Sequence, residues 1–272
     1  MSDTEASGEP PKNRLVQLVD AAFSRPIAAF EEIGSYVTLA SKFFAWVFRP
    51  PFRIGPFIAA LAFIGAESTF IVGLVGLFTG MAFTVSTIIG FRQFSAENLV
   101  GGVVAIALAR ELAPVLAAVV VTARAGSTMA SELGNMRVTE QIDAITTMGI
   151  SPVQYLVVPR ILATTAMLPL LAIAFGLAGM GGAYVVAVLG QNLDPGLFWD
   201  KVQSFLKPSD IRMALVKATL FGFIVSTICC TKGFYASGGA RGVGEATAKA
   251  VVASIVAIFA ADYVTTLMLS EL

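Results

Sequence analysis

The chain has 272 residues, of which 56% are hydrophobic and 13% are charged, and its mean hydropathy is +0.80. This composition lies outside the range of soluble globular domains and indicates a membrane protein. Eighteen Lys and Arg balance eighteen Asp and Glu, so the basic field that attracts nucleic acid is missing, and we expect no nucleic-acid partner. Histidine is absent, and the two cysteines, Cys229 and Cys230, are adjacent in an apolar run, which argues against a metal site and against Cys/His nucleophilic catalysis.

The N-terminal part is more polar than the rest of the chain. Its first dozen residues, MSDTEASGEPPK, contain no apolar segment, so we expect residues 1–13 to form a disordered tail rather than a signal peptide. Residues 14–56 then mix cations with apolar and aromatic side chains. This mixture is typical of amphipathic helices that lie on a membrane surface, so the segment is predicted to form interfacial helices.

Five apolar runs follow, each long enough for a helix that crosses a membrane. They lie at about 57–91, 99–123, 161–190, 211–231 and 246–269. The first run, at ~35 residues, exceeds one perpendicular span, so it is either one long broken helix or a re-entrant piece followed by a span. The sequence therefore predicts an all-α polytopic membrane protein with about five transmembrane helices, within a domain at residues 57–272.

The loop charges predict the orientation. With the N-terminus in the cytoplasm, the inner segments carry 12 Lys and Arg and the outer ones carry 4, which the positive-inside rule favours; the C-terminus is then periplasmic. The loop 191–212 falls outside. Asp194 and Pro195 can start a helix there and Pro208 ends the run, so a short amphipathic periplasmic helix is predicted at about 195–206. Its role, an ordered loop or a docking site for a partner, stays open.

Five ionisable residues lie inside the apolar runs, away from the ends of the runs. They are Arg110, Glu111, Lys217, Glu67 and Asp262. Charges in a bilayer normally face protein or water and pair with one another, and Lys217 is the expected partner of Glu111. They form either a structural cluster that fixes helix register or, as we favour, the lining of a cavity for an amphiphilic head group.

Glycines recur at spacings of three and four residues in the first and third runs. These are Gly73, Gly76 and Gly80, and Gly176, Gly179, Gly181 and Gly182. Such spacing lets helix backbones approach closely and predicts contact between these helices. A third glycine-rich stretch, YASGGARGVGEATAKA, lacks the spacing of a phosphate-binding loop, so we expect no ATP-hydrolysing site and no enzymatic activity in this chain.

A polar segment, MRVTEQIDAITTMGISP, interrupts the apolar chain between the second and third runs. Thr139 is the predicted N-cap of a short amphipathic helix, and Gly149 is its predicted C-cap. The helix, at about 139–149, is too short to span and lies in the cytoplasm in the predicted orientation. We interpret it as a contact that receives motion from another subunit; an interfacial helix that lies only on lipid is the alternative.

The sequence ARELAPVLAAVVVTARAGSTMASELGNMRVTEQIDAITTMGISPVQYLVVPRILA, at 109–163, resembles the signature region of MlaE-type (YrbE-type) permeases, the membrane subunits of Mce-associated ABC lipid transporters. The general layout is similar over about 30–270. The resemblance implies a homodimer in a bacterial inner membrane, bound to cytoplasmic ABC ATPase subunits and a periplasmic Mce-domain protein. The implied function is movement of phospholipid or a related lipid between inner and outer membranes, which bears on outer-membrane lipid asymmetry.

The resemblance also implies roles for particular residues. Arg110 and Glu111 match a charged pair near the family's lipid cavity, with Lys217 as their counterpart. The helix at 139–147 matches the coupling helix, so ATPase contact is expected at Arg137, Thr139, Glu140, Gln141 and Asp143. ATP would be bound by the partner subunit, and this chain would hold no cofactor. Two other classes remain as alternatives: an ion- or proton-coupled lipid carrier with Glu67, Glu111 and Asp262 as a relay, and an intramembrane lipid-modifying enzyme.

Overall fold

The computed structural model describes residues 14–50 and 54–270, and every regular element in these ranges is a helix. The predicted tail, 1–13, lies outside the described residues. The helices before the polar segment are α1 (Arg14–Val47), α2 (Ile54–Leu61), η1 (Ala62–Ala66), α3 (Glu67–Arg92), η2 (Glu97–Leu99), α4 (Val100–Ala107), η3 (Leu108–Leu112), α5 (Ala113–Val121), η4 (Thr122–Gly126) and α6 (Ser127–Val138). The remaining helices are α7 (Gln141–Thr147), η5 (Val153–Val157), α8 (Val158–Tyr184), η6 (Val185–Gly190), α9 (Pro195–Phe205), α10 (Pro208–Phe234) and α11 (Gly239–Ser270).

Within the described residues, five helical stretches are long and apolar enough to cross a membrane, which confirms the predicted all-α polytopic fold. They are Ile54–Arg92, Glu97–Val138, Val153–Gly190, Pro208–Phe234 and Gly239–Met268. The first is one continuous helix with a π-helical turn, η1, so the alternative of a re-entrant piece is wrong. Short π-helical turns also interrupt the second stretch, at η3 and η4, and form the two ends of the third, at η5 and η6; each widens the helix locally.

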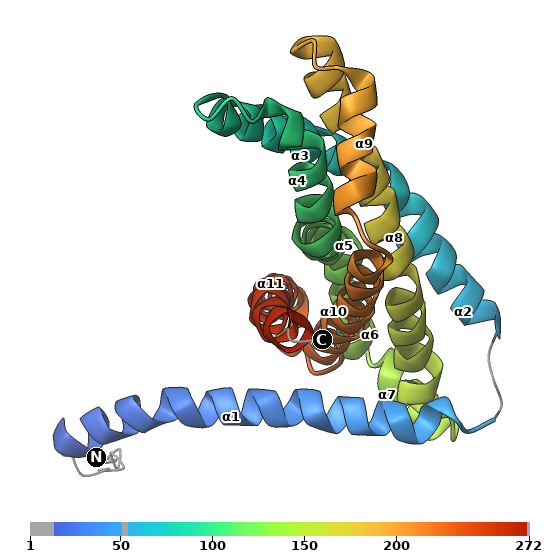
Figure 1. Ribbon diagram of the computed structural model, residues 1–272. Coiled ribbons are helices and arrows are strands. Elements are labelled where there is room, and N and C mark those ends of the chain that lie inside the picture. Colours follow the sequence, from blue (N-terminus) through green and yellow to red (C-terminus); the bar gives the residue numbers. More distant parts are fainter. Residues whose placement is uncertain (1–13, 51–53, 271–272) are drawn as a thin grey trace, which may run out of the picture.

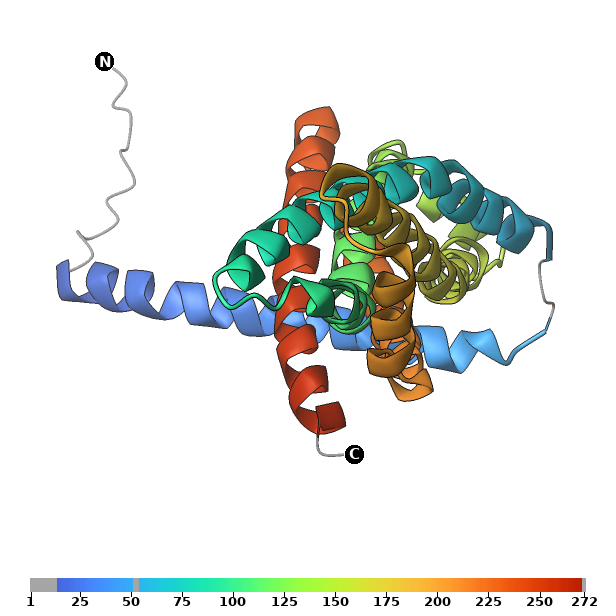
Figure 2. The same cartoon turned by 45° about the horizontal axis from the view of Figure 1, so that its top comes forward.

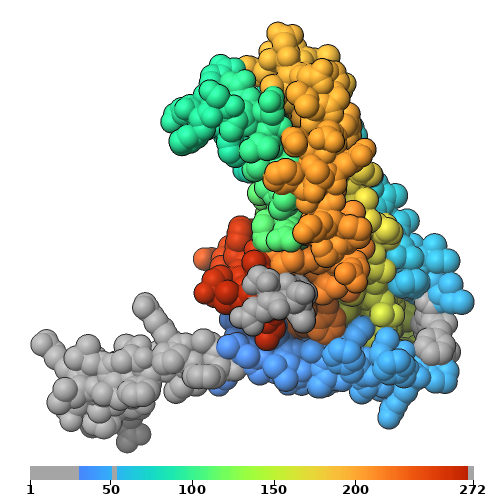
Figure 3. Space-filling model, viewed as in Figure 1, coloured from blue at the N-terminus to red at the C-terminus, as the bar shows by residue number. Residues whose placement is uncertain are grey.

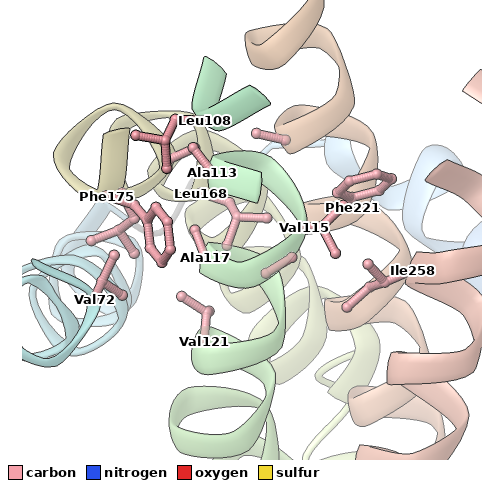
Figure 4. Close-up of a cluster of buried hydrophobic side chains, with 14 of the residues drawn as sticks. Val72, Leu108, Ala113, Val115, Ala117, Val121, Leu168, Phe175, Phe221 and Ile258 are labelled. Carbon is pink, nitrogen blue, oxygen red and sulfur yellow. The ribbon is translucent and has the colours of Figure 1, made fainter. Parts of the chain in front are cut away.

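The second stretch lies at the centre of the bundle, with α5 between α3 and α8 on one side and α10 and α11 on the other (Figure 4). The residues that meet there include Val72, Leu108, Ala113, Val115, Ala117, Val121, Leu168, Phe175, Phe221 and Ile258. Burial differs sharply among the stretches: 67% of the most apolar window of α10 is buried, but only 17% of that of α11. Helix α11 therefore lies at the edge of the subunit.

The predicted contact between the glycine-bearing helices is present where α3 crosses α8. A Cβ at Gly76 would lie 2.6 Å from the carbonyl oxygen of Phe175, and one at Gly80 would overlap the backbone of Gly179. In contrast, Gly73 and Gly181 have no such neighbour within 4 Å. Only part of the glycine pattern thus serves helix packing, because the two helices cross along one line and the other glycines face away from it.

The helices outside the spanning stretches mark two opposite ends of the bundle (Figures 1 and 2). Helices α1 and α7 lie at one end, and α9 lies at the other beside α4 and α8. The expectation that 14–56 and 139–149 share one side, opposite 195–206, agrees with this arrangement. Asp194 caps α9 as predicted, since its Oδ1 accepts from the backbone N–H of Leu197 at 2.8 Å. Phe198 and Val202 of α9 are buried against the bundle rather than turned outward.

Residues 14–56 do not form several interfacial helices as predicted. One 34-residue helix, α1, runs across the end of the bundle and stops at Val47, and the first spanning stretch already begins at Ile54. Its contact with the bundle is both apolar and charged: the Phe43 ring lies 5.7 Å from that of Phe223 in α10, and Glu32 pairs with Lys232 at 2.7 Å. Helix α1 is therefore attached to α10.

Candidate functional site

Two adjacent charges, Arg110 and Glu111, lie on the π-helical turn η3 in the second spanning stretch. Successive residues of a helix point in directions about 100° apart, so the two side chains reach different partners. Both partners lie on α10, at Asp210 and Lys217, two helical turns apart on one face. The site is thus built by matching one turn of the second stretch to one face of α10.

Arg110 pairs with Asp210, a residue that the sequence analysis left out. Its Nε lies 2.7 Å and its Nη2 2.6 Å from Asp210 Oδ1, while Oδ2 accepts from the backbone N–H of Lys207 at 2.9 Å. The carboxylate is 2% exposed, whereas the Arg110 side chain is 45% exposed. A buried carboxylate therefore holds a cation whose outer face remains accessible.

Lys217 is fully buried and joins three helices. Its Nζ donates to Glu111 Oε2 at 2.7 Å, to the hydroxyl of Thr266 at 2.7 Å and to the carbonyl oxygen of Arg110 at 3.2 Å. It also lies 2.9 Å from Asp262 Oδ1. The predicted Glu111–Lys217 pair is confirmed, and Asp262 joins it from α11. This Lys217 cluster satisfies an ammonium that would otherwise be costly in the membrane.

An apolar pocket is lined by Ala109 and Ile211, the residues that neighbour Arg110 and Asp210 in the sequence. Its volume is about 160 Å³, and its lining includes Leu108, Ala109, Met180, Ile211 and Leu215, all of them apolar. Figure 3 shows a hollow on the neighbouring face, between the end of the bundle that carries the α3–α4 connection and helix α11. A partly exposed guanidinium next to an apolar pocket is an arrangement that suits an amphiphile with an anionic head group.

Glu67 does not join this cluster, although the sequence analysis grouped the five charges together. It pairs with Arg124 of η4, whose guanidinium also donates to Ser68 Oγ at 2.8 Å and to the carbonyl oxygen of Phe63 at 2.9 Å. A relay from Glu67 to Glu111 and Asp262 is therefore not assembled by direct contact. Arg124 lies just after the predicted apolar run at 99–123, but the structure places it within a spanning stretch.

The polar segment forms a short helix, α7, but its start differs from the prediction. Thr139 is not the N-cap: it ends α6, and its hydroxyl donates to the carbonyl oxygen of Asn135 at 2.7 Å. Glu140 takes the N-cap position instead, with a left-handed backbone (φ 59°). The predicted end is confirmed, since Gly149 has φ 75° and Ile150 donates back to Ile145 at 3.2 Å, as in a Schellman motif.

One face of α7 is buried and the other is exposed. Ile142 is 2% exposed and packs in a cluster with Leu39 and Phe43 of α1. The outward face carries Thr139, Glu140, Gln141 and Asp143, with Arg137 half-buried beside them. Asp143 accepts from Arg137 Nη1 at 2.7 Å, and Gln141 Nε2 donates to Thr139 Oγ1 at 3.0 Å. This packing holds a polar surface away from the bundle.

The sequence contained a signal for Asp210 but none for Arg124. Asp210 lies seven residues before Lys217 and thus on the same face of one helix, so its pairing with the adjacent Arg110 could have been deduced. The contact of Arg124 with Glu67 depends on how two separate helices pack, which periodicity does not reveal.

Within the described residues, no group of three or more Cys, Asp or Glu side chains could hold a metal ion.

The fold and the site together define a multi-pass membrane protein with buried ion pairs between its spans and a polar helix at one end. The chain belongs to the MlaE permease family: the model of this family, described as Permease MlaE, matches residues 57–268.

Relatives from several lineages agree with this assignment. A probable ABC transporter permease protein of Rickettsia conorii is 36% identical over 252 residues, which cover 93% of this chain and 97% of the relative. A probable ABC transporter permease protein of Synechocystis is 42% identical, over 74% of this chain and 76% of its own. The chloroplastic protein TRIGALACTOSYLDIACYLGLYCEROL 1 of Arabidopsis thaliana is 39% identical over 74% of this chain and 57% of its own length.

Proposed function

We propose that this chain is the permease subunit of an ABC transporter that moves phospholipid or a related lipid between the inner and outer membranes of a bacterium. The observation that carries the proposal is the Arg110 guanidinium, partly exposed and held by buried Asp210 beside an apolar pocket. A lipid phosphate would contact Arg110, and part of an acyl chain would occupy the pocket. The name of the Arabidopsis relative includes trigalactosyldiacylglycerol, which supports a lipid as the cargo.

The Lys217 cluster positions Arg110 without contacting the lipid. Lys217 fixes η3 against α10 and α11 through Glu111 and Asp262, and this contact orients Arg110 on the neighbouring position of η3. A charged network between three helices has few alternative arrangements in a low-dielectric interior. Movement of α10 or α11 would therefore be transmitted to the cation that contacts the lipid.

The remaining partners follow from the surfaces of the subunit. A second copy of the chain would cover the hollow beside α11, where Val252, Val256, Phe259 and Tyr263 form an exposed apolar stripe at helical spacing. Separate cytoplasmic ATPase subunits would bind the outward face of α7 and hydrolyse ATP, and a periplasmic Mce-domain protein would bind the end that carries α9. In this arrangement the N-terminus is cytoplasmic and the C-terminus periplasmic.

The test is lipid transport by the reconstituted complex with its ATPase and periplasmic partners. We expect Arg110→Gln to lower ATP-dependent phospholipid transfer about tenfold, because a charge-assisted hydrogen bond to phosphate is lost, and Arg110→Lys to retain part of it. Arg92→Gln is the matched control, since Arg92 also pairs with a carboxylate, Glu97, but lies at the end of α3. Full transfer by the Arg110→Gln complex would refute the assignment of this site.

A further inference from the structure

A second cavity, of about 370 Å³, lies between α2, α6 and the start of the third spanning stretch. Its lining is mostly apolar and includes Ala60, Phe63, Ile64, Met129 and Leu156, but it also contains Glu132 and Arg160. The cavity shares none of its lining residues with the pocket beside Arg110. Figure 1 places these helices at the end of the bundle that carries α7. The cavity is thus a separate site of mixed apolar and charged character.

The two charged residues form an ion pair at the cavity wall. Arg160 Nη2 lies 2.9 Å from Glu132 Oε2, and Arg160 Nη1 also donates to the carbonyl oxygen of Leu156 at 3.0 Å. The Arg160 side chain is 19% exposed and that of Glu132 is 50% exposed. One positive and one negative group therefore border the same apolar space, and half of the glutamate side chain remains exposed.

The depth of the pair matches the head-group region of a bilayer. Arg160 lies seven residues after Val153 and Glu132 six residues before Val138, which are ends of spanning stretches, so each lies about 10 Å inside them. These stretches have 38 and 42 residues, or about 57–63 Å, against about 40–45 Å for a whole bilayer with its head groups. Their ends extend beyond the membrane, which brings the pair to head-group level.

The inner wall of the cavity is held in place by Arg124. Its guanidinium lies 5.1 Å from the centre of the Phe63 ring and donates to the backbone of the same residue. Ile64 and Met129, on the neighbouring helices, are essentially buried. The opposite wall is open, since Pro56 and Ala59 of α2 are exposed where lipid would surround the protein. A preformed cavity with an open lipid-facing side admits an amphiphile at little conformational cost.

We propose that this cavity binds one phospholipid with a zwitterionic head group, whose phosphate contacts Arg160 and whose primary ammonium contacts Glu132. A purely anionic head group would leave Glu132 without its cation, whereas a zwitterion satisfies both charges. The apolar lining takes the first part of the acyl chains. Because the cavity wall includes residues just before and just after the polar segment, an occupied site would stiffen the attachment of α7. The proposal does not rest on lipid transport.

Binding is tested by native mass spectrometry of the purified, delipidated chain titrated with phosphatidylethanolamine or phosphatidylglycerol. All variants carry Arg110→Gln, so that the site beside Asp210 does not contribute. We expect phosphatidylethanolamine to bind more tightly, and Arg160→Gln to weaken its binding about tenfold. Glu132→Gln should also weaken the binding of phosphatidylethanolamine but strengthen the binding of phosphatidylglycerol, so that the chain now prefers phosphatidylglycerol. Free phosphoethanolamine should compete only weakly, because it lacks the acyl chains.

Two controls separate binding from general damage. Arg92→Gln removes an ion pair of the same kind at the other end of the bundle and should leave the head-group preference unchanged. Ala60→Leu fills the cavity but keeps both charges, so it should weaken the binding of both lipids. The melting temperature of this variant reports whether its fold is intact. An unchanged preference after neutralisation of Arg160 and of Glu132, in variants that melt like the parent, would overturn the proposal. Equal loss in the Arg92 variant would do the same.

Discussion

Lys217 is the best-connected charged side chain of the candidate site. It has no exposed surface and contacts two carboxylates, a hydroxyl and a carbonyl oxygen from two other helices, η3 and α11. Glu111, by contrast, is 41% exposed and has Lys217 as its ion-pair partner. The two members of this pair are thus unequal: the loss of the lysine strands two carboxylates, and the loss of the glutamate leaves the lysine with three other contacts.

We therefore predict an asymmetric response to neutralisation. Lys217→Met should destabilise the chain by about 3–5 kcal/mol, the cost of leaving a buried charge without its partner. Glu111→Gln should cost clearly less, because Asp262 and Thr266 continue to bind the ammonium. Thermal unfolding in detergent measures both variants, and a further Asp262→Asn change should restore part of the stability lost in Lys217→Met. Equal losses for the two single variants would contradict this account.

At the residue scale, the sequence predicted one ion pair correctly but did not predict which of the five intramembrane charges lie together. Membrane burial makes a lone charge costly, which was enough to pair Glu111 with Lys217. It did not separate Glu67 from that cluster, because its partner, Arg124, lies just outside the predicted run at 99–123 and was not counted among the charges inside the runs. The prediction of Thr139 as an N-cap was wrong for a different reason. Threonine suits an N-cap, but its hydroxyl can also donate to a carbonyl oxygen of the preceding turn, and here it donates to that of Asn135.

Between elements, the crossing of α3 and α8 depends on close approach of their backbones. Gly80 touches the backbone of Gly179, whereas Gly73, on the same helix, has open space around it. Both glycines lie in the same helix and have the same low intrinsic helix propensity. They differ only in what a methyl group would meet, which makes them a matched pair.

We predict opposite effects of alanine at these two positions. Gly80→Ala should destabilise by about 1–3 kcal/mol, because the added methyl group forces the helices apart. Gly73→Ala should be neutral or stabilise by up to about 1 kcal/mol, since alanine favours the helix. Melting temperatures in one detergent measure both. A loss of stability in Gly73→Ala as large as in Gly80→Ala would show that the crossing geometry is wrong.

The attachment of α1 to α10 depends on pH through Glu32. Hydrogen bonds from Lys232 and Tyr36 hold the pKa of the Glu32 carboxyl below its ordinary value. A carboxyl with a lowered pKa in the folded state stabilises the fold above its ordinary pKa, and this stabilisation is lost as pH falls through the lowered value.

The expected result is a melting temperature that is higher in the parent chain than in Glu32→Gln at neutral pH, with a gap that closes in acid. Glu31→Gln is the matched control, since Glu31 is the neighbouring exposed carboxylate on the same helix, α1. A gap that stays constant from neutral pH down to about pH 3, below the ordinary carboxyl range, would show that the Glu32 charge does not contribute.

Across the whole molecule, hydropathy predicted the number and order of the spanning helices because a bilayer requires long, continuous apolar helices. It did not predict how helices end or bend. The first run has a π-helical turn at Ala62–Ala66 rather than a break, and 14–47 form one helix instead of several. Such details depend on tertiary contacts, for example the packing of Leu39 and Phe43 on the bundle. The cytoplasmic location of α1 and α7 stays a prediction.

The outward face of α7 is the place where the whole molecule would receive force from an ATPase. Ile142 anchors the helix to the bundle, and Asp143, about 100° further around the helix, has 59% of its side chain exposed. We predict that Asp143→Lys abolishes co-purification of the ATPase subunit with the tagged permease, because a cation replaces the carboxylate at the contact. Asp200→Lys is the control, since Asp200 is similarly exposed but lies on α9 at the opposite end.

A second variant separates loss of the ATPase contact from local damage. Asp143 also pairs with Arg137 within the chain, so its replacement removes an internal ion pair as well. The exchange Arg137→Asp with Asp143→Arg retains that pair with its polarity reversed. If Asp143 acts on the ATPase, the exchange variant should fail to bind it although α7 is intact. Restored binding in the exchange variant would assign Asp143 a purely internal role and shift the contact to Glu140 and Gln141.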